Sequence, residues 1–124
     1  MADVSTGFQR ETFAADTTIF RAGDAGEAAY VIDSGCVEIL LGPEGAQRRI
    51  EVLAEGAMFG EIALLDGLPR SATVRTLVPT RLIRIDRGHI EGLLQQADPV
   101  VQYLVKVLLD RVRSERIQPF VVAQ

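Results

Sequence analysis

The sequence has one cysteine and one histidine among 124 residues, and this scarcity argues against two classes of small protein. A lone Cys36 cannot form the disulfide framework that stabilises small secreted domains. Metal-dependent barrel enzymes need several His or carboxylate ligands at one site, and His89 is the only histidine. No Ser or Cys lies in a recognisable nucleophile motif. We therefore expect no catalytic residue, no metal site and no enzymatic activity.

Long apolar runs and clusters of positive charge are also missing. No run approaches the roughly 18 to 20 apolar residues that cross a bilayer, and residues 1–7 lack the pattern of a signal peptide. We expect a cytoplasmic location without membrane insertion. The net charge is −4 and most arginines are scattered, which argues against nucleic-acid binding.

Length and composition favour a single domain. A chain of 124 residues with 48% hydrophobic content is large enough for one core. We divide it into an N-terminal segment at about 1–16, a β region at 17–86, C-terminal helices at 87–116 and a tail at 117–124.

Turn signals recur at short intervals before residue 87, and the runs between them are rich in Val, Ile, Leu and Thr. Short strands with this spacing predict a sandwich or barrel. Alternation at 36–41 and 49–52, around a turn at Gly42–Gly45, predicts a hairpin. Further strands are expected at 17–20, 28–33, 72–78 and 80–86.

The spacing of the hydrophobic residues changes from a strand period to a helix period after about residue 87, where helices are expected. Residues 89–96 suit a short helix, and a longer one should begin near Pro99 with Asp98 as its N-cap. A stripe on the longer helix favours packing on the protein's own core, with a seam for a partner as the alternative. The stripe consists of Leu104, Val107, Leu108 and Val112.

The segment 59–74 is expected to place a helix start, a carboxylate and an arginine around one small space. Gly60 lets the backbone approach a ligand closely. The apolar run 62–65 predicts a helical turn, whose first N–H groups lack internal partners and attract an anion. The turn at Asp66–Gly67 should end this helix.

Arg70 is expected to open the next strand, on the core-facing side with Ala72 and Val74. A desolvated arginine without a partner costs on the order of several kcal/mol, so Arg70 needs an anion. A carboxylate, Glu61 or Asp66, would make a structural salt bridge. A ligand phosphate would fit the planar guanidinium group better. Both partners remain possible from the residues alone.

Residues 59–65 followed by 69–74 resemble the phosphate-binding cassette of cyclic nucleotide-binding domains. Residues 19–24 and 30–39 resemble the first strands and glycine turns of that family, so the resemblance covers most of the chain. It implies a mainly β fold: a jelly-roll barrel (double-stranded β-helix) with a short cassette helix and C-terminal helices. It also implies that 1–124 form one cyclic nucleotide-binding domain.

The resemblance implies roles for individual residues. Glu61 would accept a hydrogen bond from the ribose 2′-hydroxyl, and Arg70 would pair with the cyclic phosphate. Serine at position 71 is common among relatives that bind cyclic AMP, so Ser71 favours cyclic AMP, with cyclic GMP as the alternative. The implied ligand-binding set, including backbone donors, is Phe59, Gly60, Glu61, Ile62, Ala63, Arg70, Ser71, Ala72 and Arg111.

Arg111 has two interpretations, because its helix register is uncertain by a turn. Some relatives reach the ligand from a similar position, whereas the residues alone favour a basic helix end in solvent. In the family, the last helix moves when nucleotide binds and signals to an effector. The resemblance thus implies a sensor for an effector protein or for an effector domain missing from this sequence. The alternative is a jelly-roll interaction module that signals without nucleotide.

Overall fold

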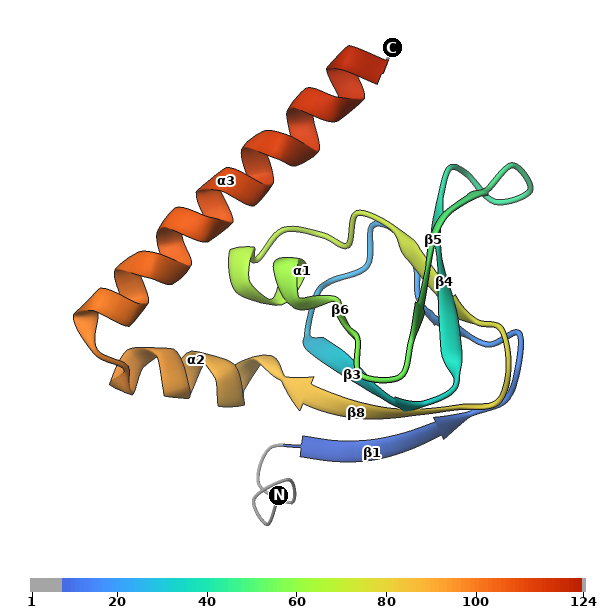
Figure 1. The fold of residues 1–124 in the computed structure, drawn as a ribbon, viewed down its shortest axis with the longest axis horizontal. Coiled ribbons are helices and arrows are strands. Elements are labelled where there is room, and N and C mark those ends of the chain that lie inside the picture. Colours follow the sequence, from blue (N-terminus) through green and yellow to red (C-terminus); the bar gives the residue numbers. More distant parts are fainter. Residues whose placement is uncertain (1–7, 124) are drawn as a thin grey trace. The chain divides into compact units, whose positions relative to one another are not determined.

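The computed structural model describes residues 8–123, apart from the side chains at position 113 and from position 115 onward. These residues form two compact units, one ending at His89 and the other beginning at Ile90 (Figure 1). The elements in order are β1 (Phe8–Phe13), β2 (Thr18–Phe20), β3 (Ala28–Ser34), β4 (Cys36–Leu41), β5 (Arg48–Ala54), β6 (Met58–Phe59), α1 (Glu61–Asp66), β7 (Thr73–Thr76), β8 (Thr80–Asp86), α2 (Arg87–Gln96) and α3 (Pro99–Ala123).

The strands of the first unit form two four-stranded antiparallel sheets. One sheet has the order β1-β8-β3-β6 and the other has the order β2-β7-β4-β5. Strands far apart in the sequence are neighbours: β1 pairs with β8 from Phe8 opposite Ile85 to Phe13 opposite Thr80. This arrangement confirms the mainly β, jelly-roll type of fold predicted from the sequence.

The predicted hairpin is formed by β4 and β5, with Val37 opposite Leu53. Its inner face follows the alternation of the sequence, since Val37 is fully buried and Ile39 packs against the same core. The core lies between the two sheets and holds residues from both. Its buried members are Ala28, Tyr30, Ile32, Val37, Phe59, Val74 and Leu82.

The strand β1 was not predicted, because it lies in the segment that we expected to precede the β region. Residues 8–13 include Gln9, Arg10 and Glu11, which break the apolar alternation on which strand prediction depends. An edge strand has only one neighbour in its sheet, so polar side chains are tolerated on it.

The strand β7 is shorter than predicted, and Arg70 lies before it instead of opening it. β7 runs only from Thr73 to Thr76. The backbone of Arg70 pairs with the loop before β3: its N–H donates to Asp24 O and its carbonyl accepts from Gly23 N, both at 2.8 Å. These bonds hold Arg70 at the turn between α1 and β7.

The helix α3 begins at Pro99 as predicted, and the Asp98 carboxylate caps it by accepting from Val100 N at 2.8 Å. The helix continues to Ala123, so the tail predicted after Arg116 is wrong. Extending an existing helix avoids a new nucleation step, which favours continuation.

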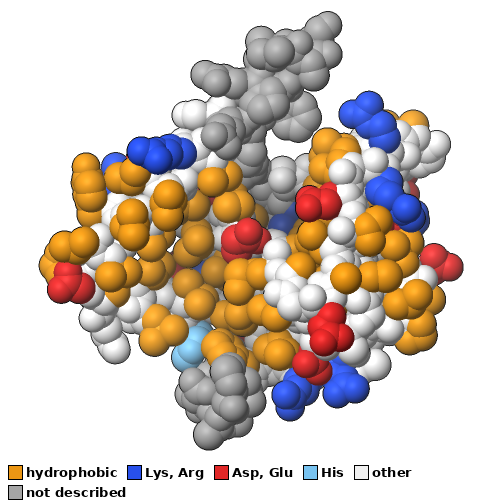
Figure 2. All heavy atoms as spheres, viewed as in Figure 1, with side chains coloured by type: hydrophobic (Ala, Val, Ile, Leu, Met, Phe, Trp, Pro, Cys, Tyr) orange, Lys and Arg blue, Asp and Glu red, His pale blue; other side chains and the backbone are white. Residues whose placement is uncertain are grey.

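The predicted apolar stripe of α3 is not buried within the second unit. Leu104 is 54% exposed and Leu108 is 49% exposed. Hydrophobic side chains are prominent on the part of this unit seen in Figure 2. Of the helices in residues 8–123, none is both long and apolar enough to cross a membrane.

Candidate functional site

A pocket in the first unit is formed by the cassette segment and the adjoining strands. Eight of the nine predicted ligand-binding residues line it. The ninth, Arg111, belongs to α3 in the second unit. The lining residues are Phe20, Ile39, Phe59, Gly60, Glu61, Ile62, Ala63, Arg70, Ser71, Ala72 and Val74.

Three apolar lining residues were missing from the predicted set: Phe20, Ile39 and Val74. They are neighbours across strands, because Val74 lies opposite Phe20 on β2 and opposite Ile39 on β4. Alternation in the sequence placed Val74 on an inward face, but it does not distinguish a pocket wall from ordinary core.

The cassette helix α1 lies between two glycines in the left-handed region, Gly60 at φ 82° and Gly67 at φ 74°. The Gly67 N–H donates to Ala63 O at 3.0 Å, so the helix ends at the predicted position. Gly60 is also required for space: a Cβ atom there would lie 2.7 Å from Nη1 of Arg70. This glycine therefore makes room for the guanidinium group.

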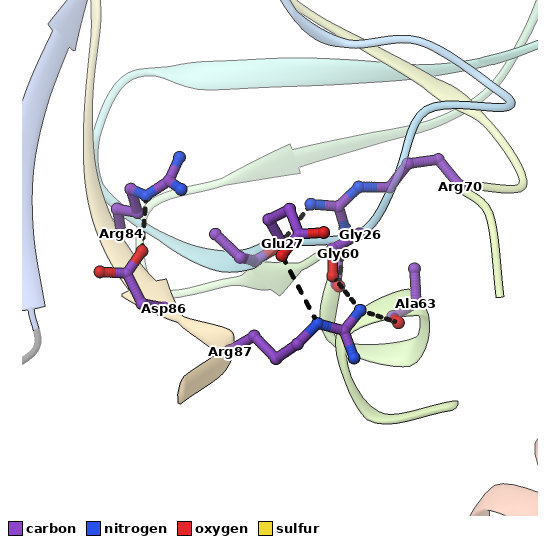
Figure 3. Close-up of polar contacts among 9 residues, drawn as sticks. Gly26, Glu27, Gly60, Ala63, Arg70, Arg84, Asp86 and Arg87 are labelled. Carbon is purple, nitrogen blue, oxygen red and sulfur yellow. Dashed lines mark hydrogen bonds and ion pairs between the residues drawn. The ribbon is translucent and has the colours of Figure 1, made fainter. Parts of the chain in front are cut away.

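The side chain of Arg70 is 5% exposed and is held by backbone oxygens. Nη1 donates to Gly60 O at 2.8 Å, and Nη2 donates to Ala28 O at 2.5 Å (Figure 3). Nε is buried and makes no hydrogen bond to any described residue. Burial lowers the pKa of Arg70 below its ordinary value, but an arginine stays protonated in a protein.

The structural salt bridge considered for Arg70 is not formed. Among the described residues, neither Glu61 nor Asp66 makes an ion pair with Arg70. Asp24 contributes a favourable charge without an ion pair to Arg70. The carbonyl dipoles orient the guanidinium group but do not neutralise it, so a buried positive charge faces the pocket.

Two further polar side chains at the pocket keep hydrogen-bonding capacity. Glu61 is half-buried, and within residues 8–123 its carboxylate makes no hydrogen bond or ion pair with a described partner. Ser71 is exposed beside Arg70. The site thus offers a cation, an acceptor-only carboxylate and a hydroxyl around one opening.

Arg87, the first residue of α2, is in contact with the cassette. Its Nη2 donates to Ala63 O at 3.2 Å and to Gly26 O, and its Nε lies 3.8 Å from the Glu27 carboxylate (Figure 3). A Cβ atom on Gly26 would lie 2.5 Å from that of Ala63, so the loop and α1 approach closely. Sequence reasoning missed Arg87 because its role depends on this tertiary approach.

The sequence and the structure match known proteins. The model of the family "Cyclic nucleotide-binding domain" matches residues 10–97. The CRP-like cAMP-activated global transcriptional regulator of Mycobacterium tuberculosis is 27% identical over 114 residues, 91% of this chain and 51% of that protein. The cyclic AMP receptor protein of Thermus thermophilus is 32% identical over 112 residues, 90% of this chain and 52% of that protein.

A solved structure, the cAMP-bound form of the EAL enzyme Bd1971, matches with 39% identity and a TM-score of 0.78, covering 91% of this chain and 30% of that one. The chain spans about half of the length of the relatives named above, or less. The family model covers most of the first unit, including the whole pocket. The chain therefore belongs to the cyclic nucleotide-binding domain family.

Proposed function

We propose that this domain is a regulatory sensor that binds a 3′,5′-cyclic nucleotide, with cyclic AMP preferred over cyclic GMP. The observation that carries the proposal is Arg70, a charged side chain that is 5% exposed at a pocket and forms no ion pair among the described residues. A cyclic phosphate would supply the anion that a buried guanidinium group needs. Binding breaks no bond in the ligand, and we propose no catalytic step.

Glu61 is proposed to bind the ribose. Its carboxylate would repel a phosphate, so it is useful only toward a neutral hydroxyl, for which it is a pure acceptor. The 2′-hydroxyl of the ligand fits this requirement. A 2′-deoxy analogue would leave the carboxylate unsatisfied, which costs about 1 to 3 kcal/mol.

The preference for cyclic AMP is supported by Ser71, whose position follows the cassette arginine. The comparison structures include a cAMP-bound form and a cGMP-bound form of the same EAL enzyme. We therefore expect both nucleotides to bind this domain, with cyclic AMP the tighter.

Signalling is proposed to use the C-terminal helices, with Arg111 as a further ligand contact from α3. Arg87 supports this route, because it connects the start of α2 with the carbonyl of Ala63 in α1. We propose that the C-terminal helices exchange between two arrangements. A ligand shifts that equilibrium only by its differential affinity for the two arrangements. The rearranged helices would act on an effector protein or on an effector domain outside this sequence.

Calorimetric titration with cyclic AMP, cyclic GMP and 5′-AMP tests the proposal. We expect both cyclic nucleotides to bind, 5′-AMP to bind much more weakly, and Arg70→Ala to weaken cyclic AMP binding by about 2 to 5 kcal/mol, roughly thirtyfold or more. Arg48→Ala is the matched control, because it removes the same charge from an exposed strand residue.

Equal binding by wild type and Arg70→Ala would contradict the assignment of the phosphate site. No heat with any nucleotide would favour the other function, an interaction module that signals without ligand. The exposed side chains Val100, Tyr103, Leu104 and Leu108 of α3 would then be the first surface to test.

A further inference from the structure

The guanidinium group of Arg70 lies against the face of the Phe20 ring. Cζ of Arg70 is 3.9 Å from the ring centroid, a distance at which the ring quadrupole attracts a cation. The carbonyl oxygens of Gly60 and Ala28 accept hydrogen bonds from its edge. The guanidinium group is therefore held both by the ring and by the two carbonyl oxygens.

The Phe20 ring is itself held in place. Its centroid lies 6.3 Å from that of Tyr30 and 5.9 Å from that of Phe59. Tyr30 and Phe59 stack on each other at 5.3 Å, and both are buried core residues. A ring packed against two buried rings has little freedom to turn.

The lack of a side chain at Gly60 leaves room for the guanidinium group next to the ring. A Cβ atom at this position would meet Nη1 of Arg70 at 2.7 Å and Cε2 of Phe20 at 3.4 Å. The backbone of Gly60 therefore lies beside both the guanidinium group of Arg70 and the ring of Phe20. Nε, which makes no hydrogen bond to a described residue, remains available as a donor.

We propose that Phe20 is a positioning residue for phosphate binding: its ring holds the Arg70 guanidinium group in the binding orientation before the ligand arrives. This inference rests on the proposed function. The ring contact is present without ligand, so it improves affinity by preorganisation and not by a new bond in the complex. A leucine would fill much of the same space without a flat, electron-rich face, and Arg70 would then sample orientations that ligand binding has to reorder.

Three variants separate positioning from ordinary core packing. Phe20→Leu removes the aromatic face, and Phe20→Tyr keeps it. Phe13→Leu makes the same substitution at another phenylalanine that packs against the core but does not line the pocket. We expect Phe20→Leu to bind cyclic AMP roughly two- to thirtyfold more weakly than the wild type. Phe20→Tyr should bind more tightly than Phe20→Leu because it keeps the aromatic face, and Phe13→Leu should bind close to the wild-type level, although both leucine variants should melt at lower temperature.

The calorimetric outcomes distinguish this inference from the function on which it rests. If Phe20→Leu binds like the wild type and only its melting temperature falls, the ring has a structural role and the inference is overturned, while the proposed function stands. If the wild type binds no cyclic nucleotide, both are overturned.

A second measurement needs no ligand. In the NMR spectrum of the free protein, a guanidinium N–H proton of Arg70 should be shifted upfield by the ring current of Phe20, because Cζ lies 3.9 Å from the ring centroid. The shift should disappear in Phe20→Leu and persist in Phe13→Leu. Guanidinium protons of Arg70 that all lie at their ordinary positions in the free wild type would overturn the inference.

Discussion

Two buried charges in the first unit, Glu38 and Arg70, differ in how they are compensated. Glu38 is 6% exposed and Arg70 is 5% exposed. Glu38 accepts hydrogen bonds from Nε of Arg49 at 3.0 Å and from Nε of Arg75 at 2.9 Å, and Nη2 of Arg75 forms an ion pair with it at 2.8 Å. It directly precedes the pocket-lining Ile39 in β4, and because neighbouring side chains in a strand point to opposite faces, it faces away from the pocket.

Glu38 has protein counterions, whereas Arg70 has none among the described residues. Burial opposes the ionisation of Glu38, but hydrogen bonds and charge from the two guanidinium groups outweigh it and hold the pKa of Glu38 below its ordinary value. Arg70 is buried with carbonyl oxygens and a ring but without a carboxylate ion pair among the described residues. A buried charge with protein counterions stabilises the fold, whereas one that faces a pocket without them is suited to bind an anion.

Removing both counterions from Glu38 should have the largest effect on stability. In Arg49→Met/Arg75→Met the carboxylate stays buried without compensation, which should lower the free energy of unfolding by about 3 to 5 kcal/mol. Urea unfolding measures this loss. Arg48→Met is the control and should change stability by less than about 0.5 kcal/mol, as surface substitutions usually do. A double variant as stable as this control would mean that Glu38 is not stabilised by its partners.

Arg70→Met should change the stability of the ligand-free protein little but should abolish the stabilisation by ligand. Relief of a desolvated charge opposes the loss of two hydrogen bonds to carbonyls, so the ligand-free protein should change by no more than about 1.5 kcal/mol. Cyclic AMP at a hundred times its Kd should stabilise the wild type by about 2.7 kcal/mol, and the same concentration should not stabilise Arg70→Met. Thermal melting with and without nucleotide measures both effects. Ligand stabilisation that survives in Arg70→Met would remove the contrast between the two sites.

The parts of the molecule that the sequence predicted are those with local signals. The hairpin of β4 and β5, the end of α1 at Gly67 and the cap at Asp98 each depend on residues close in the chain. The cassette motif likewise placed eight predicted residues at one pocket, because 59–74 form a continuous segment.

The remaining features depend on contacts between distant segments. Phe20 and Arg70 are fifty residues apart, and no spacing rule predicts that a ring will lie on a guanidinium group. The two carbonyl partners of Arg70 were also unpredictable, because every residue carries a carbonyl and only the fold selects which ones meet the side chain. The same holds for Arg87, whose acceptors come from Gly26 and Ala63.

Acidification should produce the smallest effect and should distinguish the two charges. Since the pKa of Glu38 is lower in the folded protein than its unfolded value of about 4.3, the unfolded chain binds this proton first as the pH falls. The stability due to Glu38 is therefore fully present above about pH 5 and is lost as the pH falls through the folded pKa.

In Arg49→Met/Arg75→Met only burial acts on Glu38 and raises its pKa, so acid favours the folded form of that variant through this group. The difference in unfolding free energy between wild type and double variant should therefore shrink from about pH 7 to about pH 3 in urea titrations. The difference between wild type and Arg70→Met should change much less over the same range, because arginine does not titrate there and Asp24 makes no ion pair with Arg70. If the first difference changes equally little with pH, the counterions are not what keeps Glu38 ionised, and the two buried charges are compensated in the same way.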